Sequence, residues 1–245
     1  MTRRTAPVLL AAALFTACSG LAACSGSSTQ QATPPPTIVT TTTTTRRVLA
    51  PRIVKALPVP AALFAAGLNV RAGPVPVPLQ LEIPSIGVNS GVLGVGVTTS
   101  DVMDAPEGPI HDPVWEQAFW YRGSAVPGAI STALIAGHVD GPRGTPGVFG
   151  AIGLLKPGAL IVVHDTRSGL DVRFVVTHTV SFTLDQTTQK SVLTEIYGAG
   201  PVAGTTPQRA KDGLSHLTLI TCAGTFQTGI GTHDHRLAVF ATRIK

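Results

Sequence analysis

Charged and aromatic side chains are scarce in this sequence, at 13% and 5% of its 245 residues. Hydrophobic residues make up 44%, which argues against a disordered or fibrous chain and is enough to build a core. No acidic residue occurs before Glu82, so the net charge of +5 comes from the first part of the chain. From Glu82 onward, eleven Lys and Arg stand against thirteen Asp and Glu. With few aromatics and no basic stripe there, we exclude a nucleic-acid-binding surface.

Several motifs of common chemistry are also missing. The sequence has no Gly-rich phosphate loop between a strand and a helix, no fixed-period repeat and no paired Cys-x-x-Cys. These absences exclude nucleotide-binding and structural-zinc sites, and we expect no cofactor and no metal. Of three cysteines, Cys18 and Cys24 lie near the amino terminus, which leaves Cys222 without a disulfide partner in the rest of the chain.

Residues 1–24 have the pattern of a secretory leader, because Arg3 and Arg4 precede an uncharged apolar stretch. Leu21-Ala22-Ala23-Cys24 resembles a bacterial lipobox, in which Cys24 becomes the lipid-modified first residue. An uncleaved membrane anchor is the alternative, since about 18 apolar residues just cross a bilayer. The Cys-Ser-Gly interruption at residues 18–20 favours the lipid. Either anchor predicts a protein tethered at the extracytoplasmic face of the membrane.

Residues 25–78 have the composition of a linker, dominated by Ser, Thr, Gln, Pro and Ala, with six consecutive threonines from Thr40 to Thr45. We expect a disordered spacer between the membrane and a folded domain. The more apolar segment at residues 53–68 predicts a short helix or a second membrane contact, and its prolines argue against a span.

Residues 79–245 predict one all-β domain: a closed or half-closed β-barrel with short helices, preceded by the disordered linker. Gly and Pro separate apolar runs that predict strands. These runs are Leu79–Ile83, Ala133–Ala136, Ala159–His164, Leu170–Phe182, Leu217–Thr221 and Leu237–Thr242. The run at 170–182 alternates apolar and polar residues and predicts one buried face. The last two runs are apolar at both parities, as in barrel strands that are covered on both sides.

Cys222 lies where a predicted strand ends, directly before Ala223 and Gly224. Strand ends are places where reactive groups meet solvent. An unpaired thiol in an oxidising compartment is a liability unless it is buried or used. Two interpretations therefore stay open, a small hydrophobe of the core or a reactive thiol.

Three segments resemble the sortase family. Thr218-Leu219-Ile220-Thr221-Cys222 matches the sortase pattern Thr-Leu-x-Thr-Cys, Ala136-Gly137-His138-Val139-Asp140 resembles the segment of the sortase histidine, and His235-Arg236-Leu237 resembles that of the arginine. Further segments similar to actinobacterial class E or F sortases are Ile83-Pro84-Ser85-Ile86-Gly87-Val88, Trp120-Tyr121, Pro127-Gly128, Gly147-Val148-Phe149 and Leu155-Lys156-Pro157-Gly158. The resemblance covers residues 79–244.

The resemblance implies a sortase-type cysteine transpeptidase in which Cys222 is the nucleophile, His138 the general acid and base, and Arg236 the donor to the oxyanion or to substrate carbonyls. Its implied substrates are secreted proteins with a C-terminal sorting motif similar to Leu-Pro-x-Thr-Gly or Leu-Ala-x-Thr-Gly. Cleavage would fall between Thr and Gly through a thioacyl-enzyme, and a peptidoglycan-precursor or pilin amine would accept the protein. The 14 positions from Cys222 to Arg236 predict a long loop.

Other functions stay open beside this one. A non-catalytic surface lipoprotein, with the barrel as a binding module, is the alternative from another class. Hydrolysis in place of transfer is also open, because the sequence does not tell how well water is kept out. The cell-wall transpeptidases with a Ser-His-Gly-Cys motif are disfavoured, because Thr-Leu-Ile-Thr precedes Cys222.

The remaining candidates have structural explanations. His178 falls on the apolar parity of its run and predicts a hydrogen-bonded core histidine. His233 and His235 share a strand parity, but no third metal ligand is evident. Asp140 either orients a loop or the imidazole, or is solvated. Trp120-Tyr121 predicts core residues, not a substrate platform.

Overall fold

The described residues of this structure, a computed structural model, are 70–71, 73–201 and 206–245. The predicted leader, lipobox and apolar segment at 53–68 lie outside them, as does most of the predicted linker. In the described part, no helix combines the length and the apolar character needed to cross a bilayer. The first strand begins at Val75, and the predicted domain start at Leu79 stays a prediction.

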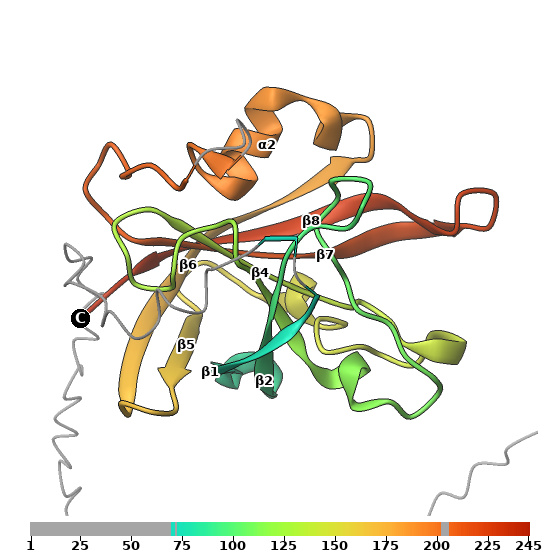
Figure 1. The fold of residues 1–245 in the computed structure, drawn as a ribbon, viewed down its shortest axis with the longest axis horizontal. Helices are drawn as coiled ribbons and strands as arrows, with labels where there is room; N and C mark the ends of the chain where they lie inside the picture. Colours follow the sequence, from blue (N-terminus) through green and yellow to red (C-terminus); the bar gives the residue numbers. More distant parts are fainter. Residues whose placement is uncertain (1–69, 72, 202–205) are drawn as a thin grey trace, which may run out of the picture. The chain divides into compact units, whose positions relative to one another are not determined.

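Eight strands and several short helices make up the domain (Figure 1). The strands are β1 (Val75–Ile83), β2 (Val88–Val95), β3 (Ala118–Tyr121), β4 (Thr132–Gly137), β5 (Leu160–Asp165), β6 (Leu170–Thr183), β7 (His216–Gln227) and β8 (Thr232–Arg243). The helices are the 3-10 turns η2 (Pro84–Ile86), η3 (Pro113–Glu116), η4 (Pro142–Gly144), η5 (Ile152–Leu154) and η6 (Gln186–Thr188), and the α-helix α2 (Lys190–Tyr197).

The strands form a closed barrel in the order β1-β2-β3-β4-β7-β8-β6-β5, and β5 pairs back with β1. The pairs β2/β3 and β4/β7 are parallel and the others are antiparallel. The predicted all-β barrel is therefore confirmed, in its closed form. Closure gives each strand two neighbours within the barrel, where no sheet edge is left open.

The six predicted strands correspond to β1 and β4 to β8, whereas β2 and β3 were not predicted. β2 is interrupted by Ser and Gly and β3 is only four residues long, so neither has a strong apolar signal. β7 and β8 also continue far beyond their apolar runs, as a hairpin that extends past the neighbouring strands in Figure 1. The predicted long loop after Cys222 is therefore mostly paired strand.

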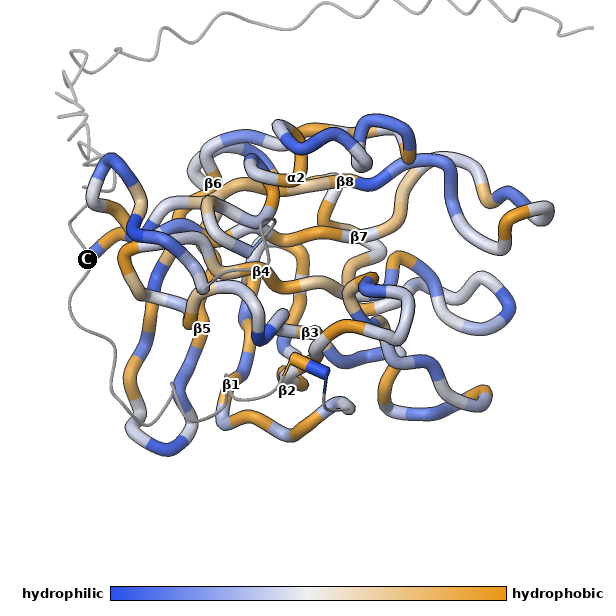
Figure 2. Tube along the Cα trace, turned by 45° about the horizontal axis from the view of Figure 1, so that its top comes forward, coloured by the Kyte–Doolittle hydropathy of each residue, from blue (hydrophilic) through white to orange (hydrophobic). Residues whose placement is uncertain are grey.

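The described residues form three apolar clusters: one inside the barrel, one under α2, and a smaller one of Val95, Val114 and Phe119. Ile135 of β4, Leu219 of β7 and Val239 of β8 are completely buried in the barrel interior. The intervening positions face outward, and α2 covers them with Ile196, so that a second cluster forms outside the barrel. Its buried members are Leu134, Phe182, Ile196, Ala238 and Phe240. Figure 2 shows the same contrast, with hydrophobic colour along the central strands and hydrophilic colour over many of the loops.

β6 does not keep one buried face along its whole length, contrary to the prediction. Val176 belongs to the barrel interior, but Phe182 belongs to the outer cluster. The pairing with β8 shifts register between Val176 and His178, and one extra residue reverses the inside-outside alternation. His178 is consequently exposed and stacks on Phe240, with ring centroids 4.6 Å apart, so the predicted core histidine is wrong.

His164 ties three strands together on the outside of the barrel. Its Nε2 lies 3.0 Å from Glu82 of β1 and its Nδ1 lies 2.6 Å from Asp171 of β6. Carboxylates only accept hydrogen bonds, so both contacts are complete when the ring carries both protons. The hydrogen bond to Glu82, followed by the contacts with Asp171, raises the pKa of His164, and the bond to His164 lowers the pKa of Asp171.

We expect this cluster to make stability depend on pH. Because the folded pKa of His164 is raised, its contribution is complete below the unfolded value of about 6.5 and is lost as the pH rises through the folded value. His164→Gln should therefore have a flatter profile, with the wild-type Tm falling by about 1–3 °C more between about pH 6 and 8. Parallel pH profiles in thermal unfolding would contradict the expectation.

Candidate active site

The parallel pairing of β4 with β7 decides where the predicted site residues lie. Thr132 lies opposite His216 and Ala136 opposite Ile220, a constant offset of 84 positions. The same offset relates His138 to Cys222, one residue past the end of β4 and inside β7. The hydroxyl of Thr221 donates to the carbonyl of Gly137 at 2.7 Å and fastens the two strands just before these residues. Continued two residues past the last pair of β4 with β7, the same register leads from Cys222 to His138.

Arg236 reaches the same place from the other side of β7. Cys222 and Arg236 are direct partners in the antiparallel pairing of β7 with β8, and cross-strand partners have side chains on the same face. Alternation along β7 points Leu219 and Thr221 inward and Ile220 and Cys222 outward. Cys222 is half-buried and is not sealed in the barrel interior. The structure thus pairs Cys222 with Arg236 on one outer face, and the register of β4 with β7, continued two residues past its last pair, leads to His138.

The ring of His138 is held from three sides. Its Nε2 lies 2.8 Å from the carbonyl oxygen of Pro106, and a carbonyl can only accept, so Nε2 carries a proton. In the neutral ring, Nδ1 is then the nitrogen that can accept one. Trp115 and Phe119 contact the ring with centroids 4.7 and 5.3 Å away. These contacts fix the ring plane and the tautomer.

The chain after His138 folds tightly back on it. The amide of Phe149 donates to the carbonyl of His138 at 2.9 Å. A Cβ at Gly147 would lie 2.4 Å from that carbonyl oxygen, and a Cβ at Gly137 would lie 2.6 Å from Val148. Both positions therefore need glycine. This explains the glycines in the segments at 136–140 and 147–149, which suggested the family.

The guanidinium of Arg236 is anchored to its own strand. Its Nη1 donates to the carbonyls of His233 at 3.0 Å and His235 at 2.8 Å, and its Nη2 donates to Oγ1 of Thr232 at 3.1 Å. Both hydrogens of Nη1 are used in these bonds. Within the described part of the chain, Nε and one hydrogen of Nη2 are left to meet another acceptor.

Asp140 contacts the β7/β8 hairpin, whereas no contact with the ring of His138 is found among the described residues. Its Oδ2 lies 3.5 Å from Nε2 of His233, whose side chain is only 13% exposed beside the ring of Phe226. This contact joins the segment that follows His138 to the β7/β8 hairpin. Among the described residues, no group of three or more His, Cys, Asp or Glu side chains is arranged to hold a metal ion.

A β-bulge lies two residues beyond Cys222. Ala223 pairs with His235 and Phe226 with His233, so β7 carries one extra residue there. Gly224 adopts φ +79°, and Oδ1 of Asp234 accepts the amide of Thr225 at 2.9 Å. The hydrogen bond with His235 is the main cause that lowers the pKa of Asp234, and it keeps this carboxylate charged. The bulge is thus closed by a side chain from the opposite strand.

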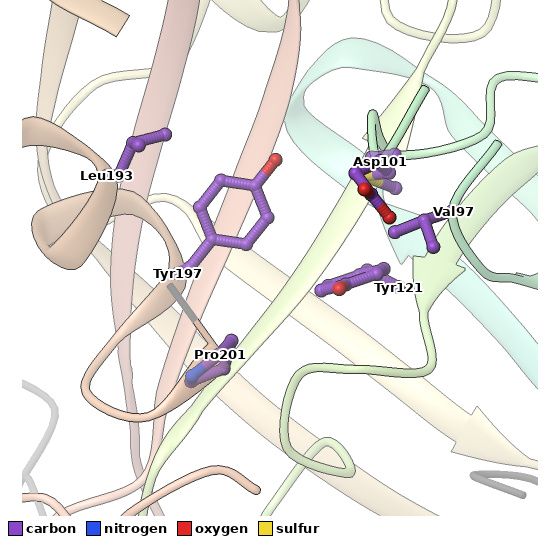
Figure 3. A pocket seen from close by; sticks show the side chains of 7 residues that line it. Val97, Asp101, Tyr121, Leu193, Tyr197 and Pro201 are labelled. Atoms are coloured by element: carbon purple, nitrogen blue, oxygen red, sulfur yellow. The ribbon is translucent and has the colours of Figure 1, made fainter. Parts of the chain in front are cut away.

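A cavity of about 210 Å³ lies on the same outer face, between α2 and the segment that connects β2 to β3 (Figure 3). It is lined by Val97, Asp101, Met103, Tyr121, Leu193, Tyr197 and Pro201. Burial raises the pKa of Tyr197 to about 12, so its hydroxyl stays neutral and donates. Trp120 is a core residue as predicted, at 1% exposure, but Tyr121 lines the cavity instead.

Residues 81–244 match the Sortase domain family. This chain belongs to the sortase family. Similar solved structures include sortase A from Corynebacterium diphtheriae, which is 20% identical with a TM-score of 0.44 over 69% of this chain and 61% of that one. A lid mutant of the same sortase A is 17% identical, with a TM-score of 0.48 over 76% of this chain and 93% of that one. Sortase C-1 from Actinomyces oris is 18% identical, with a TM-score of 0.47 over 81% of this chain and 92% of that one. No curated protein matches the sequence.

Sequence reasoning missed the residues that hold this sortase's site together. Pro106 contributes only a carbonyl, which no side-chain pattern reveals. Thr232 was inside a segment taken for a loop, although it shares the strand parity of Arg236 four residues later. Aromatic residues are so few in this sequence that Trp115 and Phe119 could have been singled out as candidate contacts of the site.

We expect Gly224→Ala to destabilise the hairpin. The added Cβ would lie 2.0 Å from Oδ1 of Asp234, and a positive φ is unfavourable for alanine, so the free energy of unfolding should fall by about 1–2 kcal/mol. Gly229→Ala is the matched control, since nothing lies within 4 Å of its Cβ position in the same hairpin. Urea unfolding of both variants tests this, and equal stabilities would show that the bulge is not constrained.

Proposed function

We propose that this protein is a cysteine transpeptidase of the sortase type. The observation that supports the proposal is the strand register, which makes Cys222 and Arg236 direct partners and, continued two residues past the end of the β4 and β7 pairing, leads to His138. Membership of the sortase family supports the same class of reaction. The proposed nucleophile lies in β7 and the proposed base one residue past the end of the neighbouring strand β4, an arrangement that suits acyl transfer.

The proton steps follow from the tautomer of His138. With Nε2–H held by the carbonyl of Pro106, Nδ1 takes the proton of the Cys222 thiol. The thiolate attacks the carbonyl carbon of the scissile amide and forms a C–S bond. The imidazolium then returns the proton to the leaving amine as the C–N bond breaks, which leaves a thioester on Cys222. An incoming amine gives a proton to the ring, attacks the thioester and regenerates the thiol.

Arg236 stabilises the charge that develops on the carbonyl oxygen. Its free donors are Nε–H and the remaining hydrogen of Nη2, and a guanidinium stays charged throughout. Because three of its contacts are made with its own strand, the group is oriented before substrate binds. Fixed donors need no reorganisation when the oxyanion forms.

The substrates in this proposal are secreted proteins with a C-terminal sorting motif similar to Leu-Pro-x-Thr-Gly or Leu-Ala-x-Thr-Gly, cut between Thr and Gly. The cavity supports this, since its lining residues Met103, Tyr121 and Tyr197 pack against the same apolar cluster as Ile220, two residues before Cys222. A peptidoglycan-precursor or pilin amine is the acceptor. The enzyme acts at the extracytoplasmic face, tethered through residues 1–24.

The first test is adduct formation on Cys222. The full chain is incubated with sorting-motif peptides, with and without an amine acceptor, and the peptide that contains Cys222 is examined by mass spectrometry. We expect a thioester on Cys222, none in Cys222→Ala, and a rate about 10²–10⁴-fold lower in His138→Asn. His216→Asn, at the far end of β7, should keep the wild-type rate.

Absence of any adduct over a panel of such peptides would overturn the proposal and favour the non-catalytic binding module. Release of the peptide at an equal rate with and without the amine would indicate hydrolysis in place of transfer. An amine-dependent product with a new amide bond supports transpeptidation.

A second test concerns the cavity. Leu193→Ala removes apolar lining without touching the three site residues, so we expect KM for the sorting peptide to rise about five- to tenfold while kcat changes less than about twofold. Leu170→Ala, on an exposed position at the start of β6, is the matched control. Equal KM values for the two variants would show that the cavity does not bind the motif.

A further inference from the structure

Thr232 links the thiol to the arginine. Its Oγ1 lies 3.1 Å from Nη2 of Arg236 and 4.0 Å from Sγ of Cys222. Thr232 is the first residue of β8 and pairs with Gln227, five positions after Cys222. The hairpin therefore adds the side chain of Thr232 to the site. Neither the family resemblance nor the reaction scheme above uses this residue.

The bulge at Gly224 accounts for this contact. Four residues of extended strand, from Thr232 to Arg236, span about 13 Å, and Cys222 lies opposite Arg236. A flat hairpin would keep the hydroxyl well away from the sulfur. A bulge bends its strand and re-aims nearby side chains, and the Asp234 carboxylate holds this bulge closed. The hydroxyl is thereby returned toward Cys222.

The hydrogens available on each group decide the direction of the bond between Arg236 and Thr232. A guanidinium has no acceptor, so Oγ1 of Thr232 must accept from Arg236. The single hydroxyl hydrogen and one lone pair remain. The thiol of Cys222 can donate to that lone pair, and after it loses its proton the hydroxyl can turn and donate to the thiolate. The same hydroxyl thus serves both protonation states, and in the second it is polarised by the arginine charge.

We propose that Thr232 is a positioning residue of the nucleophile, whose hydroxyl accepts from Arg236 and donates to the Cys222 thiolate once the proton has passed to His138. The inference rests on the proposed function in taking Cys222 as the nucleophile. In the transfer, the S–H bond breaks, the proton goes to Nδ1 of His138, and the Thr232 O–H bond stays intact.

Several other titratable groups lie on the elements next to Cys222. His138 lies beyond the end of β4, and β8 contributes Arg236 and His235. His233 is paired with Asp140 from the segment after His138, and His235 is paired with Asp234. All of them remain in the Thr232 variants, so a difference between those variants reports the hydroxyl alone.

The test is the pH profile of Cys222 alkylation in the full chain. Iodoacetamide is the probe, and mass spectrometry of the Cys222 peptide separates this thiol from Cys18 and Cys24. For Thr232→Val, which keeps the side-chain shape, we expect the profile to move to higher pH and the rate near pH 7 to fall about three- to tenfold. Thr232→Ser should restore most of the wild-type profile. Thr228→Val, at the exposed end of the same hairpin, should leave it unchanged.

The double variant Thr232→Val/Arg236→Gln shows whether the two residues act together. If the hydroxyl carries the arginine's influence to the sulfur, the two single effects on alkylation should not add. Thermal unfolding of each variant separates a loss of fold from a change at the thiol. Thr232→Ala also lacks the hydroxyl, and its alkylation profile is measured as a second test beside that of Thr232→Val. Wild-type profiles in both folded variants, or a Ser variant no better than Val, would overturn the inference.

Failure of this inference is distinct from failure of the proposed function. Unchanged alkylation profiles together with wild-type acyl adducts would remove the role of Thr232 and leave the transpeptidase proposal intact. A shifted alkylation profile without any acyl adduct would support the link between Thr232 and the thiol and overturn the proposed transpeptidase activity.

Discussion

The pairing of β7 with β4 on one side and β8 on the other is the constraint on which the site depends. A fixed offset along β4 and a direct cross-strand pair on β8 bring residues distant in sequence to one place. A slip of one residue in β7 would turn Cys222 into the barrel and Thr221 out of it. The interior packing of Leu217 and Leu219 prevents such a slip, since both would lose their complete burial.

Sequence patterns were sufficient for six of the eight strands, which alternate or are apolar throughout, but β2 and β3 lack such a signal. The three site residues lie in recognisable segments, and their roles stay a prediction. The patterns also failed where the structure depends on one extra residue. The shift near His178 reverses the faces of β6, and a second bulge lies at Gly224, in a hairpin that was expected to be a loop. Bulges add no hydrophobic signal of their own, so periodicity cannot locate them. The Pro106 carbonyl that fixes the tautomer of His138 is invisible to any pattern of side chains.

The hairpin is what distinguishes the observed site from the expected one. A long loop would leave Arg236 with conformational freedom that has to be lost on binding substrate. Paired strands instead anchor its guanidinium on two backbone carbonyls and a hydroxyl. The contact between Asp140 and His233 then ties the hairpin to the segment that carries His138. Both halves of the site are therefore fixed to each other as well as to the barrel.

Burial along β7 gives the thiol the surroundings its chemistry needs. Thr218 is almost completely buried beneath the outer cluster, Ile220 and Cys222 are half-buried, and the residues from Gly224 to Gln227 are exposed. Partial burial strengthens the electrostatic effect of Arg236 on a developing charge, since fewer waters screen it. Full burial would exclude a polypeptide substrate and disfavour the thiolate. Because the apolar cover ends where the strand leaves the barrel, the sulfur of Cys222 is half-buried there, with the hydroxyl of Thr232 4.0 Å away.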